Sequence, residues 1–497
     1  MSNLSELIGG GGGGGKTADF VASGTIPNGI GVVVNSNGTV SAVSADGFPT
    51  VISNAATFNN AATGYIDAAY DPISKKIGLI FHHANQPTFV MGEVSGSGIT
   101  FGTFYVLKSE AVQAGSTSVV YDASFDCFVV TFAYVDGSYN GYFATRHSGK
   151  LQAYVASGSN SIGFYSQYNL ESYGFGSWTQ VQSIYDPIQM RTVIAYRWNN
   201  PYYTTYIKSL QITGNNNYSP SAQYTLGSQG DANYAQDMAY DSYSNVVVFC
   251  YTRSGSVYFR SLQLNGSSIT VGSEYNPSIA TNGAPKLTFD SSSNKTVAGY
   301  AHWTGSAING LMFLVTYSSG TFSKTSSVAI PSYTNAEINE LSFDSTNNLI
   351  GINFRQGSPL STYFATATVS GNALSFGSVT QFPGSSSQPN PSYVYDSANE
   401  QFVSSYINYD NNSYGSYSRI TPASSNNALF AGTSAAAIAN GATGTVTLRG
   451  GVADNLSGLT PAATYYVQAD GAISTATSLQ KAGQALSSST LLLVGQT

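Results

Sequence analysis

Charged residues are scarce in this chain: Lys, Arg, Asp and Glu make up 9% of its 497 residues, whereas about a quarter is usual in globular proteins. The 18 Lys and Arg are outnumbered by 25 Asp and Glu, so the net charge is −7 at pH 7. Nucleic acid and anionic membranes attract surfaces with an excess of basic residues. The composition therefore argues against nucleic acid as a partner and against membrane insertion.

Membrane helices, disulfide frameworks and signal peptides are also missing. Apolar runs are short fragments such as Leu491–Val494, far below the roughly 18 residues of a membrane helix. Two cysteines, Cys127 and Cys250, cannot build a disulfide framework. Residues 1–8 lack the basic start and apolar stretch of a signal peptide. We therefore expect a soluble protein made in the host cytoplasm and released with its assembly, as virion proteins are.

Material for a folded core is plentiful, and it is arranged in repeats. Hydrophobic residues make up 42% of the chain, with 36 Tyr and 25 Phe, which excludes a disordered chain. Each repeat has an aromatic residue followed by Asp, and a second aromatic residue ten positions after that Asp. The seven repeated aspartates are Asp71, Asp122, Asp186, Asp241, Asp290, Asp344 and Asp396.

The repeat predicts an all-β fold, a seven-bladed β-propeller. Between the two aromatic residues lie β-rich runs such as Val246–Phe249, and helical patterning is almost absent. A unit of about 50 residues holds four short strands of a propeller blade, whereas an open solenoid uses shorter repeats. The residues after each Asp form turns, so the Asp is interpreted as structural rather than catalytic. The strand at 48–53 would complete the seventh blade.

Four segments follow from this organisation. Residues 1–16 are expected to be a docking peptide and a polyglycine tether, residues 17–47 a β-hairpin module with its turn at Asn37-Gly38, residues 48–427 the propeller, and residues 428–497 a small C-terminal β domain. Within the first segment the residues expected to dock on a partner protein are Leu4, Leu7 and Ile8.

Motifs for catalysis and cofactors are weak. Gly10–Thr17 matches a phosphate-binding loop, but any glycine run before Lys-Thr does so, and the required strand and helix are missing. The four histidines lack metal-ligand spacing, so neither a metal nor a cofactor is expected. A hydrolase using paired carboxylates is less favoured because the acids lie at the repeated Asp or on loops, as we interpret Glu337, Glu340 and Asp231.

A binding face is predicted where the second strand of each repeat runs into the following loop. There the repeats place polar and aromatic side chains, which could stack on sugar rings and bond to their hydroxyls; the alternative is that they only cap the ends of the blades. The candidate glycan-binding residues are His83, Tyr134, Arg197, Trp198, Arg253, His302, Trp303 and Arg355.

Both flanks resemble proteins of tailed-bacteriophage virions. The N-terminal stretch Met1–Ile8 with Asp19–Gly24 resembles virion proteins of cyanophages and other marine phages, and Ser457–Thr460 with Thr464–Val467 resembles a small module of tail-fibre proteins. The resemblance implies a tail fibre or adhesin, a structural protein rather than an enzyme, that docks on other virion proteins through its N-terminus and is a homo-oligomer, a trimer by analogy with phage fibres. A host-surface glycan would be its ligand. A polysaccharide depolymerase and a capsid decoration or spacer protein are the alternatives.

Overall fold

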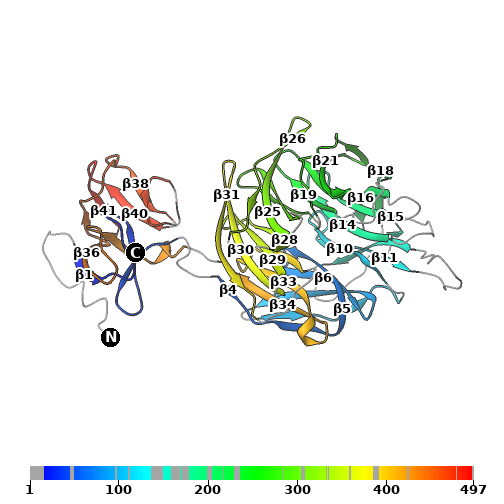
Figure 1. The fold of residues 1–497 in the computed structure, drawn as a ribbon, viewed down its shortest axis with the longest axis horizontal. Coiled ribbons are helices and arrows are strands. Elements are labelled where there is room, and N and C mark those ends of the chain that lie inside the picture. Colours follow the sequence, from blue (N-terminus) through cyan, green and yellow to red (C-terminus); the bar gives the residue numbers. More distant parts are fainter. Residues whose placement is uncertain are drawn as a thin grey trace. The chain divides into compact units, whose positions relative to one another are not determined.

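The chain is all-β in its described parts, and it divides into two units (Figure 1). The computed structural model describes residues 16–44, 50–95, 98–109, 112–135, 149–157, 168–169, 178–198, 204–214, 217–228, 236–281, 283, 285–303, 308–331, 333, 335–357, 360–383, 391–422, 425–468, 470–476, 478 and 480–494. Over these residues the only helical elements are two short 3-10 turns, η1 (Tyr409–Asn411) and η2 (Asn427–Leu429). One unit comprises Met1–Val51 with Pro422–Thr497, and the other comprises Ile52–Thr421.

The smaller unit joins the two flanks of the chain. The expected hairpin at Asn37-Gly38 forms, but its strands continue into a sheet with C-terminal strands, in the order β1-β36-β35-β2-β3. The hairpin residues and the C-terminal segment, which we expected as separate modules, share this sheet because Ile26 and Val32 are buried with Val446 in one cluster. The strands are β1 (Thr17–Val21), β2 (Gly31–Val34), β3 (Val40–Ala42), β35 (Phe430–Ser434) and β36 (Thr443–Leu448).

A second sheet of this unit is entirely C-terminal, in the order β37-β41-β40-β38-β39. Its core includes Val467, Leu491 and Leu493, together with Val33 of the hairpin. Its strands are β37 (Val452–Ala453), β38 (Thr464–Val467), β39 (Ile473–Ser474), β40 (Gln480–Ala485) and β41 (Leu491–Leu493).

In the larger unit each repeat forms an antiparallel sheet whose first strand ends at the repeated Asp. The first three repeats consist of β5 (Ala56–Asp71), β6 (Lys76–His83), β7 (Gln86–Ser95) and β8 (Gly98–Phe101); β10 (Val112–Asp122), β11 (Cys127–Val135), β12 (Gly149–Ser157) and β13 (Tyr168–Asn169); and β14 (Trp178–Asp186), β15 (Arg191–Trp198), β16 (Thr204–Gly214) and β17 (Asn217–Pro220).

The next three repeats follow the same plan. They consist of β19 (Gln236–Asp241), β20 (Val246–Arg253), β21 (Ser256–Asn265) and β22 (Ser268–Val271); β23 (Lys286–Asp290), β24 (Lys295–Trp303), β25 (Ile308–Ser318) and β26 (Thr321–Lys324); and β28 (Ala336–Asp344), β29 (Leu349–Gly357), β30 (Leu360–Ser370) and β31 (Ala373–Gln381). Short outer strands, β9 (Tyr105–Val106), β18 (Tyr224–Ser228) and β27 (Val328–Ala329), pair with β7, β16 and β25.

The last repeat supplies β32 (Ser392–Asp396), β33 (Gln401–Asn408) and β34 (Tyr414–Thr421). Its outer edge is covered from the start of the unit, because β4 (Val51–Ile52) and the first residues of β5 pair with β34. The first strands of successive repeats contact one another in chain order, and β32 contacts β5. The two ends of the larger unit therefore meet.

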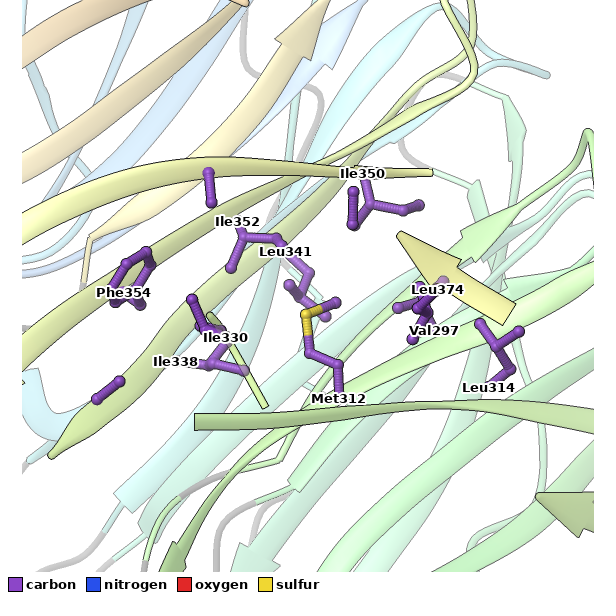
Figure 2. Packing of buried hydrophobic residues seen from close by; sticks show 13 residues of the cluster. Val297, Met312, Leu314, Ile330, Ile338, Leu341, Ile350, Ile352, Phe354 and Leu374 are labelled. Carbon is purple, nitrogen blue, oxygen red and sulfur yellow. The ribbon is translucent and has the colours of Figure 1, made fainter. Parts of the chain in front are cut away.

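Apolar side chains between successive sheets form the core. Figure 2 shows one such layer, in which Met312 and Leu314 of β25 lie near Ile338 and Leu341 of β28 and Ile350 and Ile352 of β29. Full burial of such side chains contributes about 1.5–3 kcal/mol each. Second strands such as β6 and β20 are buried along nearly their whole length. Because both of their faces are covered, their residues do not alternate between apolar and polar as in a sheet with one wet face.

The repeated aspartates close the turn between the first two strands. Asp186 shows the pattern: its Oδ1 accepts hydrogen bonds from the backbone N–H groups of Ile188, at 2.9 Å, and Gln189, at 3.0 Å. The residue four positions after each Asp has a positive φ, from 49° at Asp126 to 59° at Lys75. The carboxylate thus supplies the acceptor that a tight turn needs.

The tyrosine before the Asp reaches the turn of the preceding repeat. The hydroxyls of Tyr121 and Tyr240 lie close enough to Asp71 and Asp186 for these carboxylates to add to the effect of burial and raise their pKa values. The same two hydroxyls donate to Asp126 Oδ1, at 2.6 Å, and Asn245 Oδ1, at 3.4 Å. The hydroxyl of Tyr185 accepts a hydrogen bond from the Ser124 N–H, at 3.1 Å. We call these contacts the tyrosine latch; its members are Tyr70, Tyr121, Tyr185 and Tyr240, and Tyr395 lies in the same place beside Asp344.

Tyr70 connects the first repeat to the last. Its hydroxyl bonds to the Asp396 carboxylate and accepts a hydrogen bond from the Ala398 N–H, at 3.2 Å. Burial, together with the nearby Asp396, raises the pKa of Tyr70 to about 12. The aromatic-Asp pair of the sequence is therefore a contact between neighbouring repeats as well as a turn.

Candidate functional site

The residues predicted to bind glycan lie near the ends of second strands: His83 on β6, Tyr134 on β11, Arg197 and Trp198 on β15, Arg253 on β20, His302 and Trp303 on β24, and Arg355 on β29. The side chains of Tyr134, Trp198 and Trp303 lie outside the described part of the structure. The docking residues Leu4, Leu7 and Ile8 also lie outside the described residues.

The described side chains of this predicted face have local partners. The Arg253 guanidinium pairs with Glu274, with Nη2 and Oε1 2.6 Å apart, and lies 4.1 Å from the ring centroid of Tyr258. His302 Nδ1 lies 2.9 Å from the Ala280 carbonyl oxygen. Arg197 has only 2% of its surface exposed, so its guanidinium does not reach the outer surface.

Two further members contact residues at the start of a first strand. His83 Nδ1 lies 3.1 Å from Asn59 Oδ1. Arg355 Nε donates to Glu337 Oε2 at 2.8 Å, and Glu337 lines a cavity described below. Each described member is thus held by partners within its own region.

A different set of residues lies at the centre of the larger unit. The position four residues before each repeated Asp is polar in every repeat, and it falls on the first strand. We call this set the inner ring: Asp67, Ser118, Gln182, Asp237, Lys286, Glu340 and Ser392. Five of its members line a cavity of about 180 Å³, which also contacts Tyr65, Glu337 and Asn339.

Inner-ring side chains bond to the backbone of the next repeat. Asp67 Oδ2 accepts a hydrogen bond from the Val119 N–H, at 2.8 Å, and Asp237 Oδ2 accepts one from the Leu287 N–H, at 2.7 Å. Ser118 Oγ accepts one from Ser183, at 3.1 Å. The first strand of each sheet is an edge with unpaired N–H groups, and such groups need an acceptor when buried.

The charges of the inner ring are concentrated around Lys286. Its Nζ lies 2.6 Å from Glu340 Oε2, and each side chain keeps 20% of its surface exposed. Burial opposes the positive charge of Lys286, but the carboxylates of Glu340 and Asp237 outweigh burial and raise its pKa. The lysine therefore stays protonated beside the acids.

Burial acts in the other direction on the acids. It raises the pKa of Asp237 to about 7, against the lowering effect of Lys286. Burial also raises the pKa values of Asp67 and Glu340. These carboxyl groups consequently take up protons at a higher pH than ordinary surface acids.

The oxygens of these acids are engaged. Asp237 Oδ1 accepts from the Met238 N–H, at 2.9 Å, in addition to its bond with Leu287. Glu340 Oε1 accepts from the Leu341 N–H, at 3.2 Å, and Oε2 accepts from Lys286. General acid or base catalysis needs a carboxyl group within reach of the substrate, so the arrangement favours binding over proton transfer.

The structure corrects the sequence interpretation of the acids. Glu337 and Glu340 lie on β28 (Ala336–Asp344), not on a loop. A register shift between Ile338 and Glu340 in the pairing with β29 breaks the strand pattern there, which made the strand hard to recognise. Asp231 lies outside the described residues.

Three side chains at the cavity wall can contact a ligand without breaking the hydrogen bonds of the acids to neighbouring strands. Tyr65 is 37% exposed, and Gln182 and Asn339 add amide groups. An aromatic face beside amides suits a polar, uncharged molecule with hydroxyl groups. Over the residues that the structure describes, no cluster of three or more His, Cys, Asp or Glu could hold a metal ion.

Sequence reasoning missed the inner ring, although its signal was present. The predicted binding face is defined by the position two residues after the second aromatic, whereas the residue four positions before the Asp is polar in every copy. A polar residue repeated within β-rich segments marks a buried group that needs a partner.

Comparisons with known proteins give a fold-level likeness and no family. No family model matches the chain, and no curated protein matches it. No described helix is long and apolar enough to cross a membrane.

The chain is similar to three solved structures. They are a polysaccharide lyase, Uly1 (8% identity, TM-score 0.46, 75% of this chain and 99% of that one); the NanB sialidase from Streptococcus pneumoniae (10%, 0.42, 75% and 70%); and the Dos1 propeller (10%, 0.44, 74% and 94%). At these scores and identities, the likenesses carry no argument about the site or the activity.

Proposed function

We propose that residues 52–421 form a seven-bladed β-propeller. Three observations support this architecture: the repeat in the sequence, the contacts of successive first strands that return from β32 to β5, and the pairing of β4 and β5 with β34. Completing the last sheet with an N-terminal strand removes an exposed edge.

The function that the geometry supports best is non-catalytic binding of a host-surface glycan through a single sugar unit at the cavity beside the inner ring, since its volume of about 180 Å³ is below the range of about 300–1,000 Å³ for whole small molecules. The observation that carries this proposal is the wall of the cavity, where Tyr65, Gln182 and Asn339 lie with the acids Asp67 and Glu340. The oxygens of both acids already accept hydrogen bonds. Sugar recognition uses aromatic faces and amide hydrogen bonds. The engaged carboxylates would keep the cavity polar without making it reactive.

Binding assays with the purified chain test this function. Isothermal titration with oligosaccharides released from host polysaccharide should give saturable binding, weakened about tenfold or more by Asn339→Ala, since a lost hydrogen bond in a shielded site costs about 1–3 kcal/mol. Glu93→Gln, on β7 and away from the cavity, is the matched control. Binding that survives Asn339→Ala together with Gln182→Ala would place the glycan elsewhere, with Trp198 and Trp303 as the next candidates.

The setting that we propose is a tailed-phage virion, in which the chain is a tail fibre or adhesin docked through residues 1–16 and assembled as a homo-oligomer. The resemblance of both flanks supports this setting. Deleting residues 1–16 should abolish incorporation into particles, and normal incorporation would refute the docking role. Light scattering of the purified chain tests the oligomer.

Depolymerase activity is the second candidate, favoured by one observation: Asp67 and Glu340 line the cavity, and burial raises their pKa values, as a general acid requires. Chromatography of host polysaccharide after incubation separates the two functions. Shortened chains that disappear with Asp67→Asn would establish the enzyme, and intact chains with bound protein would establish the adhesin. Neither binding nor cleavage would leave a capsid decoration or spacer role.

A further inference from the structure

A second cavity opens at the other end of the same first strands. Thr288, Ser342 and Val394 line it, and each lies two residues beyond an inner-ring member on β23, β28 or β32. Alternate residues of a strand share a face, and the rise of about 3.3 Å per residue puts this cavity roughly 7 Å further along. Its volume is about 420 Å³.

The wall of this cavity is polar but carries no ionised side chain. Hydroxyl groups come from Thr288, Ser342, Ser345 and Ser397, and the other residues around it are aromatic, aliphatic or proline. This differs from the cavity beside the inner ring, where Lys286, Glu337 and Glu340 are present. A charged ligand would find no counter-ion here, whereas a ligand rich in hydroxyl groups would find both donors and acceptors.

Aromatic rings at this cavity are held in place. Tyr70 is half-buried, and its hydroxyl is fixed on the turn of the last repeat by Asp396 and Ala398. Phe343, also half-buried, lines the same wall. Rings fixed in this way offer a stacking surface at little cost in conformational entropy.

Two buried hydroxyls at the cavity have no hydrogen-bond partner among the described residues. They belong to Tyr393 and Tyr395, which line the wall with 5% and 9% of their surfaces exposed. Buried hydroxyls without partners are rare, and they often mark the position of a missing water or ligand group.

We propose that this cavity is a second binding site, specific for a neutral saccharide of one or two rings. Its volume lies in the range of small-molecule sites, about 300–1,000 Å³. The carboxylates of Asp344 and Asp396, which close adjacent turns, disfavour uronic acids and phosphorylated sugars. The site is separate from the cavity of the proposed function, and its test does not depend on that function.

The test is titration of the full chain with lactose and maltose, in which binding is measured by calorimetry or saturation-transfer NMR. Glucuronate and glucosamine are the charged comparisons. Ser342→Phe fills the cavity and should weaken binding more than tenfold. Thr288→Val removes one hydroxyl at nearly constant volume and should weaken binding about three- to tenfold, so it serves if Ser342→Phe fails to fold. Asn339→Ala, in the other cavity, should leave lactose and maltose binding unchanged.

Each outcome decides the proposal. Binding of a neutral disaccharide that is lost with the cavity variants and kept with Asn339→Ala supports it. No binding of either disaccharide, equal binding of glucuronate, or binding that survives Thr288→Val and Ser342→Phe overturns it. Loss of binding with Asn339→Ala alone would assign the sugar to the cavity of the proposed function instead.

Discussion

The contact between Tyr70 and the turn at Asp396 should hold the first and last repeats together. The substitution Tyr70→Phe removes one hydroxyl and leaves the ring. Two interactions are lost: the bond to the Asp396 carboxylate and the hydrogen bond from the Ala398 N–H. The Ala398 N–H also donates to Asp396 Oδ1, at 3.1 Å, so it still has a hydrogen-bond acceptor in the variant.

The expected cost follows from these contacts. Hydrogen bonds to charged groups contribute about 1.5–3 kcal/mol, and the partial exposure of Tyr70 lets water replace part of that. We therefore expect the free energy of unfolding to fall by about 1–2 kcal/mol. Urea unfolding followed by tyrosine fluorescence measures it.

Two controls separate ring closure from a generic loss of a hydroxyl. Tyr185→Phe removes the corresponding contact between neighbouring repeats, where Ser124 donates at 3.1 Å, and should cost a similar amount. Hydrogen exchange should accelerate in β32, β33 and β34 with Tyr70→Phe but not with Tyr185→Phe, because only Tyr70 joins the chain's last repeat to its first. A change below about 0.5 kcal/mol, the usual range for surface substitutions, with unaltered exchange would refute the role of the latch.

Three further outcomes are expected from single substitutions. Phe289→Tyr places a hydroxyl beside Asp241 of the preceding repeat and should raise the urea midpoint, with a gain of up to about 1 kcal/mol. Met190→Asn should stabilise the chain by about 0.5–1 kcal/mol in thermal unfolding, because Met190 has a φ of 51° whereas the equivalent Asn294, at 57°, suits that conformation. Burial raises the pKa of Asp237 to about 7 in the folded state, so the folded chain binds a proton that the unfolded chain has already released. The free energy of unfolding should therefore fall as pH rises from about 4 to 7, by at most about 4 kcal/mol. Asp237→Asn should flatten this slope, and an unchanged slope would exclude Asp237 as its source.

Much of the fold could be predicted because the repeat combines a turn with a fixed strand spacing. The turn after Asp186 and the buried strand at Val246–Phe249 are both favoured by the local sequence, independently of contacts with distant parts of the chain. The 16-residue strand β5 could not be predicted, because its first residues pair with the last repeat and its later residues with β6. Such a division depends on where the chain's ends meet, not on local propensity.

The candidate site was less predictable, for a physical reason. Arg253 and Arg355 looked like ligand-binding groups because their carboxylate partners, Glu274 and Glu337, are distant in the chain or lie on an unrecognised strand. Arg197 looked exposed because it follows Tyr196, but strands covered on both faces bury successive residues and remove the alternation that would have shown its burial. Pairing in space, rather than residue type, decides which side chains remain for a ligand.

The latch and the inner ring lie at two positions along the same first strands, and the junction of the first two repeats has both, since Asp67 accepts a hydrogen bond from the Val119 N–H there. Phe289 and Phe343 replace the latch tyrosine in two successive repeats, so no hydroxyl is available there. At these two junctions the inner ring supplies ionised groups: Asp237 accepts from the Leu287 N–H, and Lys286 pairs with Glu340. Breaking a buried pair by removing one partner costs about 3–5 kcal/mol. Substitutions of Lys286 or Glu340 should therefore lower stability before they alter binding, and ligand assays on this cavity are better made with Asn339 and Gln182.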